Sequence, residues 1–211
     1  MSSLSVVSNQ QLMEQARFSL RGRWRTAVIT YFLYFLVTGL VRLVFSLTGK
    51  GGIVAGDILC FVISGPLSLG LAGFWLSISR GQDARVSQLF DGFDRFGTAL
   101  SAYLLVLIFV LLWSLLLIVP GIIAYLSYSQ MFFILADDKS LGPLAAIRKS
   151  KEMMQGNRWK LFWLWCRFIG WFLLSVLTCG IGFLWLGPYF NVSLAKFYDD
   201  ILGNAYVTDR S

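Results

Sequence analysis

One uncharged stretch of the chain, Leu100 to Ala136, constrains the fold more than any other part of the sequence. The stretch is longer than the roughly 20 apolar residues that one helix needs to cross a bilayer core, and Pro120-Gly121 interrupts it near its middle. Proline disfavours a helical conformation in the residue before it, and glycine accepts the backbone angles of a tight reversal. The stretch therefore predicts two membrane-crossing helices joined by a turn at Pro120-Gly121.

The composition of the whole chain favours a protein that lives in a lipid bilayer. Of 211 residues, 57% are apolar and 14% are charged, whereas soluble domains average about 25% charged residues. The formal net charge is +7, but the basic residues flank apolar runs instead of forming a separate soluble surface. We therefore expect an anionic membrane surface as a partner and no nucleic acid, and we interpret residues 1–211 as a single integral membrane domain.

The same pattern of apolar runs and turn residues predicts two further hairpins. The expected fold is an all-α, polytopic membrane protein with six transmembrane helices in three hairpins. Gly65-Pro66 should kink or locally break the second crossing, and Cys179-Gly180 should form the turn between the fifth and sixth. The parts of the chain are expected to be an N-terminal amphipathic helix at 8–24, hairpin 1 at 26–79, a surface helix with hairpin 2 at 84–136, and a surface helix with hairpin 3 at 140–203.

Three segments outside the crossings have the apolar spacing of amphipathic surface helices. In residues 8–24 that spacing fits either a helix in the lipid headgroup region or a helix packed on the protein's own cytoplasmic face. Ser140 is the expected N-cap of the third surface helix, with Pro143 in its first turn. The predicted apolar face of the second surface helix comprises Val86, Leu89, Phe90, Phe93 and Phe96.

The three hairpins resemble one another, which indicates an internal repeat of the kind found in transporter folds. Each begins after a basic-aromatic pair and contains a proline-glycine pair, and the second and third units both end in two aspartates. The alternative is that any protein built of hairpins needs a turn and an interfacial Arg-Trp pair. The matching positions are Arg23-Trp24, Arg95-Phe96 and Arg158-Trp159; Gly65-Pro66, Pro120-Gly121 and Gly187-Pro188; and Asp137-Asp138 and Asp199-Asp200.

The distribution of positive charge predicts how the chain lies in the membrane. Most of the 18 lysines and arginines fall before the first crossing, in the 80–97 and 137–160 connections, or near the end of the last crossing. Only Lys50 falls in a connection on the other side. Because loops rich in Lys and Arg stay on the cytoplasmic side, both termini should be cytoplasmic.

Charged residues inside the predicted crossings are the first candidates for a functional site, because each is costly to insert into a bilayer. Arg42 and Asp57 flank the first external turn and are expected to form an ion pair across that hairpin. Arg167 either snorkels toward the cytoplasmic headgroups or faces the bundle interior, where it would contact an anion or a phospholipid headgroup. Lys196 is expected to be an interfacial anchor.

Basic residues next to the cytoplasmic leaflet are candidates for contacts with anionic lipid. Each such residue contributes about 1 kcal/mol of attraction to an anionic leaflet. The predicted contacts are Arg23, Arg25, Arg148, Lys149, Lys151, Arg158 and Lys160.

No pattern typical of an enzyme is present. Histidine is absent, which excludes His-dependent triads, and the chain has no GxSxG, Walker or HExxH motif. The three cysteines form no CxxC pair and are expected to be small packing residues. The paired aspartates and Asp91-Gly92-Phe93-Asp94 match no metal-binding loop. We therefore expect no enzymatic activity, no cofactor and no metal.

A set of short motifs is similar to a bacterial family of integral membrane proteins of unknown function. The resemblance covers roughly residues 10–203 and implies a multi-pass helical protein of the bacterial cytoplasmic membrane, but it implies no catalytic or binding residue. The motifs are LFDGF at 89–93, FG at 96–97, LWSLLLIVPGII at 112–123, ILAD at 134–137, SKEMM at 150–154 and GIGFLW at 180–185.

Two functions follow from this sequence. The first is a non-enzymatic interaction or envelope-maintenance protein of the inner membrane, whose cytoplasmic helices contact lipid. The alternative is a small-molecule transporter or channel, which predicts a polar path formed by Arg167, the kinks at Pro66 and Pro188, and the cluster Ser127–Ser129.

Overall fold

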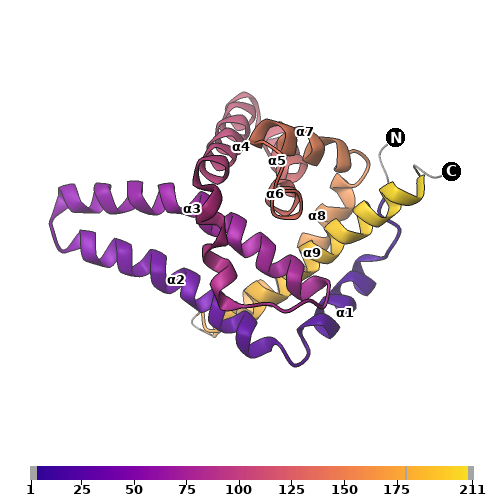
Figure 1. Cartoon of the computed structure of the whole chain (residues 1–211), viewed down its shortest axis with the longest axis horizontal. Coiled ribbons are helices and arrows are strands. Elements are labelled where there is room, and N and C mark those ends of the chain that lie inside the picture. The colour runs from indigo at the N-terminus through magenta and orange to yellow at the C-terminus, as the bar shows by residue number, and fades with distance from the viewer. Residues whose placement is uncertain (1–3, 179, 209–211) are drawn as a thin grey trace.

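The structure is a computed structural model that describes residues 4–178 and 180–208, with side chains described as far as 204. The described chain is almost entirely helical (Figure 1), which confirms the predicted all-α class. Its elements are α1 (Asn9–Leu20), α2 (Trp24–Ser46), α3 (Lys50–Ser79), the 3-10 helix η1 (Val86–Arg95), α4 (Phe96–Leu116), α5 (Ile118–Tyr128), α6 (Met131–Asp137), α7 (Pro143–Met153), α8 (Arg158–Leu177) and α9 (Phe183–Thr208).

Five helical segments among the described residues are long and apolar enough to cross a membrane. They are Trp24–Ser46, Lys50–Ser79, Val86–Leu116, Ile118–Asp137 and Arg158–Leu177. The predicted sixth crossing lies in α9, which falls outside this set because its second half carries Lys196, Asp199 and Asp200. Six crossings therefore stay a prediction, whereas several apolar spans are present.

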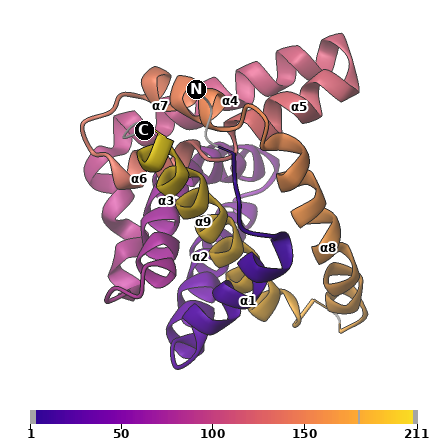
Figure 2. The same cartoon turned by 90° about the vertical axis from the view of Figure 1, so that its right-hand side faces the viewer.

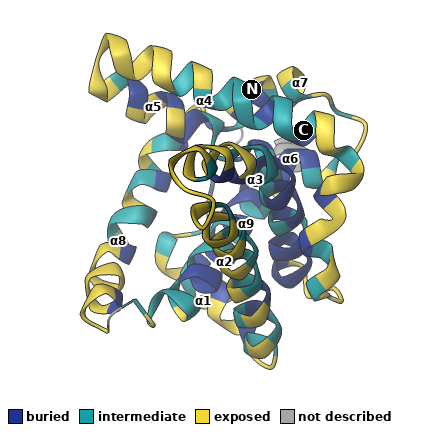
Figure 3. Ribbon diagram, turned by 90° about the vertical axis from the view of Figure 1, so that its left-hand side faces the viewer, coloured by how far each residue is buried: buried dark blue, intermediate teal, exposed yellow. Residues whose placement is uncertain are grey.

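The long helices form three hairpins, α2–α3, α4–α5 and α8–α9, whose tips point away from one another. Helix α6 continues α5 to Asp137, and the two together form the second arm of the middle hairpin. The tip of α2–α3 stands apart from the rest of the molecule in Figure 1, and the tips of α4–α5 and α8–α9 diverge in Figure 2. The hairpin tips, defined as residues 44–51, 111–119 and 171–178, are mostly exposed, whereas buried residues gather where the hairpins meet (Figure 3). A shared core therefore forms at one end of the hairpins only.

The turn of the middle hairpin lies three residues earlier than predicted. Leu117 is the extended residue between α4 and α5, and Pro120 and Gly121 belong to the first turns of α5. Proline fits there because the first turn of a helix leaves its N–H groups without intrahelical acceptors. Gly121 allows the two helices to approach, since a Cβ at this position would lie 2.1 Å from Ser114 Oγ.

Pro66 bends α3 without ending it, so the predicted kink is present and a break is not. The helix is continuous from Lys50 to Ser79, and its ribbon changes direction near its middle (Figure 1). Gly65 and Gly70 flank the bend and let other backbones pack against it. A Cβ on Gly65 would lie 2.8 Å from the Ala99 carbonyl oxygen, and one on Gly70 would lie 2.1 Å from that of Leu89.

The second surface helix is a 3-10 helix, and its apolar face differs from the predicted one. Residues three apart align in a 3-10 helix, so Leu89 and Gly92 form the buried row that faces α3. Phe90, Phe93 and Phe96 form a second row with ring centroids 6.3 Å apart, and all three remain exposed. The phenylalanines therefore face outward instead of joining the core.

The third surface helix begins two residues later than predicted. Gly142 is its N-cap and Pro143 is its first residue. Ser140 is not the cap, because its backbone N–H and its hydroxyl both donate to Asp138 Oδ1, at 3.0 and 2.6 Å. The Ser140 side chain therefore stabilises the turn before α7 and does not cap the helix.

The apolar face of α1 packs on the protein. Ser8 caps the helix in a reciprocal pair with Gln11. Leu12, Ala16 and Leu20 are fully buried, and α1 lies along α9. Of the two predicted positions for this helix, the structure has the one on the protein's own surface.

Candidate functional site

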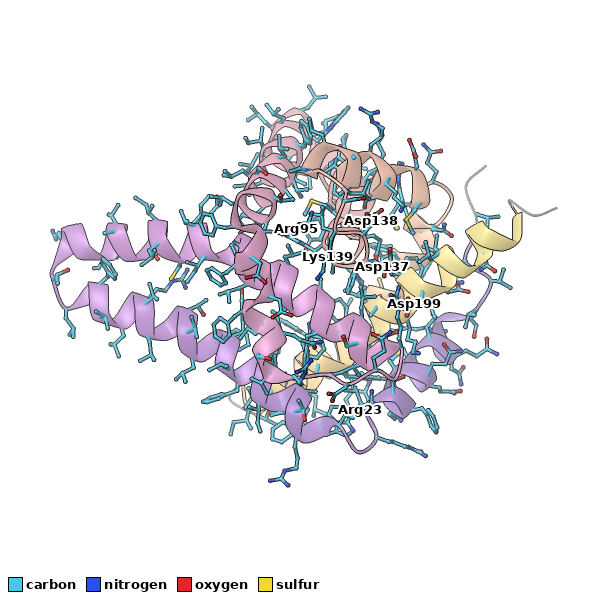
Figure 4. All side chains as sticks on the ribbon, in the orientation of Figure 1. Arg23, Arg95, Asp137, Asp138, Lys139 and Asp199 are labelled. Carbon is cyan, nitrogen blue, oxygen red and sulfur yellow. The ribbon has the colours of Figure 1, made fainter. Side chains whose placement is uncertain are left out.

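A group of polar side chains joins the second helices of all three hairpins. We call it the polar junction and define it as Ser79, Arg80, Asp137, Tyr198 and Asp199. Ser79 and Arg80 end α3, Asp137 ends α6, and Tyr198 and Asp199 lie in α9. Asp137 and Asp199 face the same region in Figure 4.

Arg80 is the centre of the polar junction, because its guanidinium binds carboxylates from two other hairpins. Its Nη1 donates to Asp137 Oδ1, and its Nε and Nη2 each lie 3.0 Å from Asp199 Oδ1. Ser79 Oγ donates to Asp199 Oδ2 at 2.6 Å, and the Tyr198 hydroxyl donates to Asp137 Oδ2 at 3.1 Å. Three hairpins are thereby connected through charge-assisted hydrogen bonds, which are stronger than neutral ones.

The junction contains one guanidinium and two carboxylates, which are only partly shielded from water. The side chains of Arg80, Asp137 and Asp199 are 30%, 24% and 25% exposed. The hydrogen bond to Asp137 raises the pKa of Arg80 above its already high usual value. Lys196 adds a second cation, since its Nζ donates to the Ser79 carbonyl oxygen.

Two arginines of the basic-aromatic pairs donate hydrogen bonds to backbone carbonyl groups near the end of their own hairpin. Arg23 binds the segment after α3, and Arg95 binds the end of α6 and the segment after it. Arg23 donates through Nη1 to the Gln82 carbonyl oxygen at 2.9 Å and through Nη2 to that of Gly81 at 2.8 Å. Arg95 donates to the carbonyl oxygens of Leu135 and Leu141 at 2.8 and 2.9 Å. Leu135 lies in the last turn of α6, where carbonyl groups lack intrahelical donors, and the other three carbonyl groups lie in the connections after α3 and α6.

The third hairpin uses an ion pair at the corresponding place. Lys160 Nζ, near the start of α8, lies 3.9 Å from Asp200 Oδ2 in α9. It also donates to the Ser5 carbonyl oxygen at 2.9 Å, and the Ser5 hydroxyl donates to the Asp200 carboxylate. The N-terminal segment therefore takes part in closing the third hairpin.

A polar cavity of about 500 Å³ lies beside the junction, between α3, η1 and α6. It brings together side chains of both signs, so its chemistry suits a small polar or zwitterionic molecule better than a simple ion. Within the described residues, no group of three or more potential metal ligands is present. Its polar lining comprises Ser77, Arg80, Gln82, Gln88, Asp91, Asp94, Arg95, Asp137 and Lys139.

The sequence-predicted intramembrane residues do not gather at one site. Arg42 Nε and Asp57 Oδ1 do form the expected pair across the first hairpin, at 3.3 Å, with side chains 66% and 60% exposed. Arg167 is exposed on α8, away from this pair. The structure thus contains a local ion pair and a separate arginine.

The predicted lipid contacts divide into engaged and outward-facing residues. Arg23 and Lys160 donate hydrogen bonds to carbonyl groups of the protein itself, as described above. Arg25, Arg148 and Lys151 are exposed, whereas Lys149 and Arg158 are half-buried. Only part of the predicted set is therefore presented to the surroundings.

Three of the residues predicted for a transporter's polar path have local hydrogen bonds or face outward. Ser127 Oγ donates to the Ile123 carbonyl oxygen and Ser129 Oγ to that of Leu126, so both hydroxyls bond within their own helix. Arg167 is exposed instead of facing an interior channel.

Sequence reasoning did not identify Arg80 as the central residue. The paired aspartates were considered as metal ligands and as helix caps, whereas Asp137 and Asp199 bind Arg80. The predicted repeat indicates this pairing, because its second and third units end in aspartates and its first unit ends near Arg80. If the equivalent ends of the three units lie together, Arg80 is expected to form ion pairs with these aspartates.

Comparison with known proteins places the chain in one family. It matches the family described as Protein of unknown function (DUF975) over residues 6–127 and 115–205. Neither the comparison with curated proteins nor the comparison with solved structures finds a match.

Proposed function

Since the chain belongs to the DUF975 family, whose function is unknown, we propose from its own structure that it is a non-enzymatic, multi-pass membrane scaffold. It acts by interaction, in envelope maintenance or in holding other components, within the bacterial cytoplasmic membrane. The polar junction lies at the cytoplasmic face, and the apolar hairpins extend into the bilayer.

The observation that carries this proposal is the contrast between the two ends of the hairpins. Arg80 connects three hairpins at one end, while large apolar side chains such as Leu115 and Leu177 remain exposed at the other. Extended apolar surfaces on a protein mark sites that contact lipid or other proteins. Three separate apolar arms on one polar base suit a scaffold better than a closed pore.

The proposed orientation rests on where the basic residues lie along the helices. Arg23, Arg95 and Arg158 stand at the starts of α2, α4 and α8, on the junction side, and Lys50 stands at the opposite end of a hairpin. Positive residues favour the cytoplasmic side. With α9 as a sixth crossing, both termini are cytoplasmic.

The internal repeat is part of the proposal, because corresponding contacts recur. In the second and third hairpins a glycine packs against the serine seven residues before it. A Cβ on Gly121 would lie 2.9 Å from Ser114 Cα, and one on Gly182 would lie 2.8 Å from Ser175 Cα. Together with the arginine contacts at the hairpin ends, this favours three related units around the polar junction.

Lipid contact is proposed for two exposed surfaces on the junction side. The first is the outward-facing part of α7, with Arg148 and Lys151. The second is the row of Phe90 and Phe93 on η1 with Phe96 at the start of α4. Basic and aromatic side chains side by side are typical of elements that lie at a membrane surface.

The lipid-contact proposal is tested by reversing the charge of α7. In Arg148→Glu, Lys149→Glu, Lys151→Glu, three attractions of about 1 kcal/mol each are removed. We expect the preference of the reconstituted protein for phosphatidylglycerol over phosphatidylcholine to fall at least tenfold, and α7 to lose protection from hydrogen exchange. The matched control, with the three residues changed to Gln, should fall between wild type and the Glu variant. Unchanged lipid preference and unchanged exchange in the Glu variant would refute the contact.

The scaffold proposal is separated from the transporter alternative by a flux assay. Purified protein in liposomes is expected to show no more flux of ions or small solutes than protein-free vesicles. Flux that depends on the protein, and that is lost in Arg167→Gln, would replace the scaffold with a transporter.

The orientation is tested with cysteine labelling. A cysteine-free protein with Lys50→Cys should react with a membrane-impermeant maleimide added outside the cell, whereas one with Lys151→Cys should react only after the membrane is opened. The reverse pattern would invert the proposed topology.

A further inference from the structure

We infer that the groove between α8 and α9 binds one acyl chain of a glycerophospholipid from the leaflet beside the polar junction. This inference rests on the proposed membrane residence and goes beyond it by assigning a specific lipid site. The groove has a volume of about 490 Å³ and is lined almost entirely by apolar and aromatic side chains.

Two helical stripes form the walls of the groove. On α8 the wall residues are Phe162, Trp165, Ile169 and Phe172, and on α9 they are Phe183, Leu186, Gly187 and Phe190. Both sets recur every three or four residues, which places each on one face of its helix. The walls therefore run along the helices, as an extended chain would.

The ends and floor of the groove are defined by ring contacts. Near the tip, Phe172 and Phe183 meet edge to face, with ring centroids 5.1 Å apart. Tyr31 from α2 forms the floor, and a Cβ added to Gly187 would lie 2.1 Å from the Tyr31 ring. Gly187 thus brings α9 close to α2 while α8 stands further out.

The length of the groove matches one leaflet. Phe172 lies ten residues after Phe162, a rise of about 15 Å along a helix, which is half of a hydrocarbon core about 30 Å thick. Phe162 lies four residues into α8, at the junction end of the hairpin. A chain from that leaflet would fill the groove from its headgroup end to the Phe172–Phe183 contact.

Two buried donors on the same face of α8 lack acceptors in the described part of the chain. They are Arg158 Nε and Trp165 Nε1. The residues are seven apart, two helical turns, so they follow the same stripe as Phe162 and Ile169. A buried donor without an acceptor is unfavourable, which points to an acceptor supplied by a ligand.

A glycerophospholipid has a phosphate group and, closer to its acyl chains, ester carbonyl groups. These acceptors follow the same order as the two donors, Arg158 at the start of α8 and Trp165 two turns further along. Arginine suits a phosphate group, which would lie at the start of α8 beside Arg158. Tryptophan suits a neutral acceptor at the border of the apolar region, where a lipid has its ester carbonyl. The Trp165 side chain lines the groove, and the proposal requires a rotation of this side chain that turns its buried N–H toward the bound ester.

The test measures lipid retained by the purified, delipidated full-length protein. Dioleoyl phosphatidylglycerol and dioleoylglycerol, which has the same chains without the phosphate, are titrated in detergent and counted by native mass spectrometry. For wild type we expect one tightly bound phosphatidylglycerol, held about tenfold more tightly than dioleoylglycerol. Absence of such a lipid would overturn the inference.

Filling the groove should remove the lipid, and a matched control should not. Ile169→Trp places an indole in the groove and is expected to weaken binding at least tenfold. Leu174→Trp adds the same bulk on an exposed part of α8 that does not line the groove, and it should bind as wild type. Equal weakening by both variants would indicate only a belt of surrounding lipid and would overturn the site.

Two further variants separate the headgroup from the ester. Arg158→Gln should abolish the preference for phosphatidylglycerol over dioleoylglycerol, whereas Trp165→Phe should weaken both lipids about fivefold and keep the preference. An unchanged preference in Arg158→Gln would remove the phosphate from the site. Thermal melting followed by circular dichroism checks the fold, and Ile169→Phe replaces Ile169→Trp if the latter is unfolded.

Failure of the lipid site and failure of the membrane scaffold give different results. A protein that resists alkaline carbonate extraction but retains no lipid contradicts only the groove inference. A protein released by carbonate contradicts membrane residence itself, and the groove inference falls with it.

Discussion

The polar junction and the hairpin tips are opposite ends of the same helices, and they are held in different ways. At the junction, Arg80 reaches carboxylates 57 and 119 residues away in sequence. At the tips, Leu115 is 87% and Leu177 is 80% exposed, and the closest contacts lie within each hairpin, as between Gly121 and Ser114.

This contrast indicates where the arrangement of the three hairpins is specified. The directed hydrogen bonds of the polar junction, and the close backbone contacts between η1 and α3 beside it, depend on single residues, so they select one arrangement. Apolar tips in lipid gain no hydrophobic advantage from contact with one another, because lipid tails are equally apolar. Substitutions at the junction should therefore cost far more than similar substitutions toward the tips.

The largest effect is expected from Gly92→Ala. Its new Cβ would lie 1.9 Å from the Pro66 carbonyl oxygen, which is backbone and cannot rotate away, so η1 must leave α3. We expect a loss of about 3 kcal/mol in the free energy of unfolding, measured by titration with a denaturing detergent. Gly97→Ala is the control, because a Cβ there meets nothing within 4 Å. Equal stability of the two variants would contradict the close packing of η1.

The next effect is expected from Arg80→Gln, which leaves Asp137 and Asp199 without their cation. Because these side chains are 24–30% exposed, solvent screening reduces the loss to about 2 kcal/mol. Adding Asp137→Asn and Asp199→Asn should restore part of the stability in the same titration. If the added substitutions only deepen the loss, the charges are not the source of the effect.

Arg23→Gln should cost about 1 kcal/mol, because the carbonyl groups of Gly81 and Gln82 lose a charged donor. Arg25→Gln is the matched control, since Arg25 is exposed two residues away. Hydrogen exchange of residues 80–83 should rise in the first variant alone. Equal exchange in both would show that the Arg23 contacts do not hold this segment.

The smallest effect is expected at the tips, from separating Arg42 and Asp57. For a pair 66% and 60% exposed, a double-mutant cycle with Arg42→Gln and Asp57→Asn should give a coupling of about 0.5 kcal/mol or less. A coupling above about 2 kcal/mol would mean that the pair is buried in hydrocarbon, and it would weaken the contrast between junction and tips.

The sequence predicted those features that depend on local pattern. The all-α class follows from long apolar runs, and the Arg42–Asp57 pair follows from two opposite charges on either side of a turn. The sequence predicted the turn at Pro120-Gly121, whereas it lies at Leu117. The residues around both positions are uniformly apolar, and proline fits the first turn of a helix as well as a reversal of the chain. Hydrophobicity alone does not distinguish these positions.

The polar junction was not predictable in the same way. Its bonds join residues far apart in sequence, and neither Arg80 nor Asp199 belongs to a local motif that names its partner. The row Leu89–Gly92 likewise fits either an α-helix or a 3-10 helix, and only the approach of η1 to the bend in α3 decides between them. The periodicity of apolar residues predicts the helices, but the packing of the hairpins against one another depends on contacts between residues far apart in sequence.

The packing of α1 against α9 has a consequence for biosynthesis. Arg17 stacks on and donates to Tyr189, 172 residues later, so α1 cannot pack on α9 until the segment that contains Tyr189 has been made. Meanwhile its apolar face, with Leu12, Ala16 and Leu20, suits a transient position on the membrane surface. Docking of α1 on α9 therefore follows the synthesis of α9.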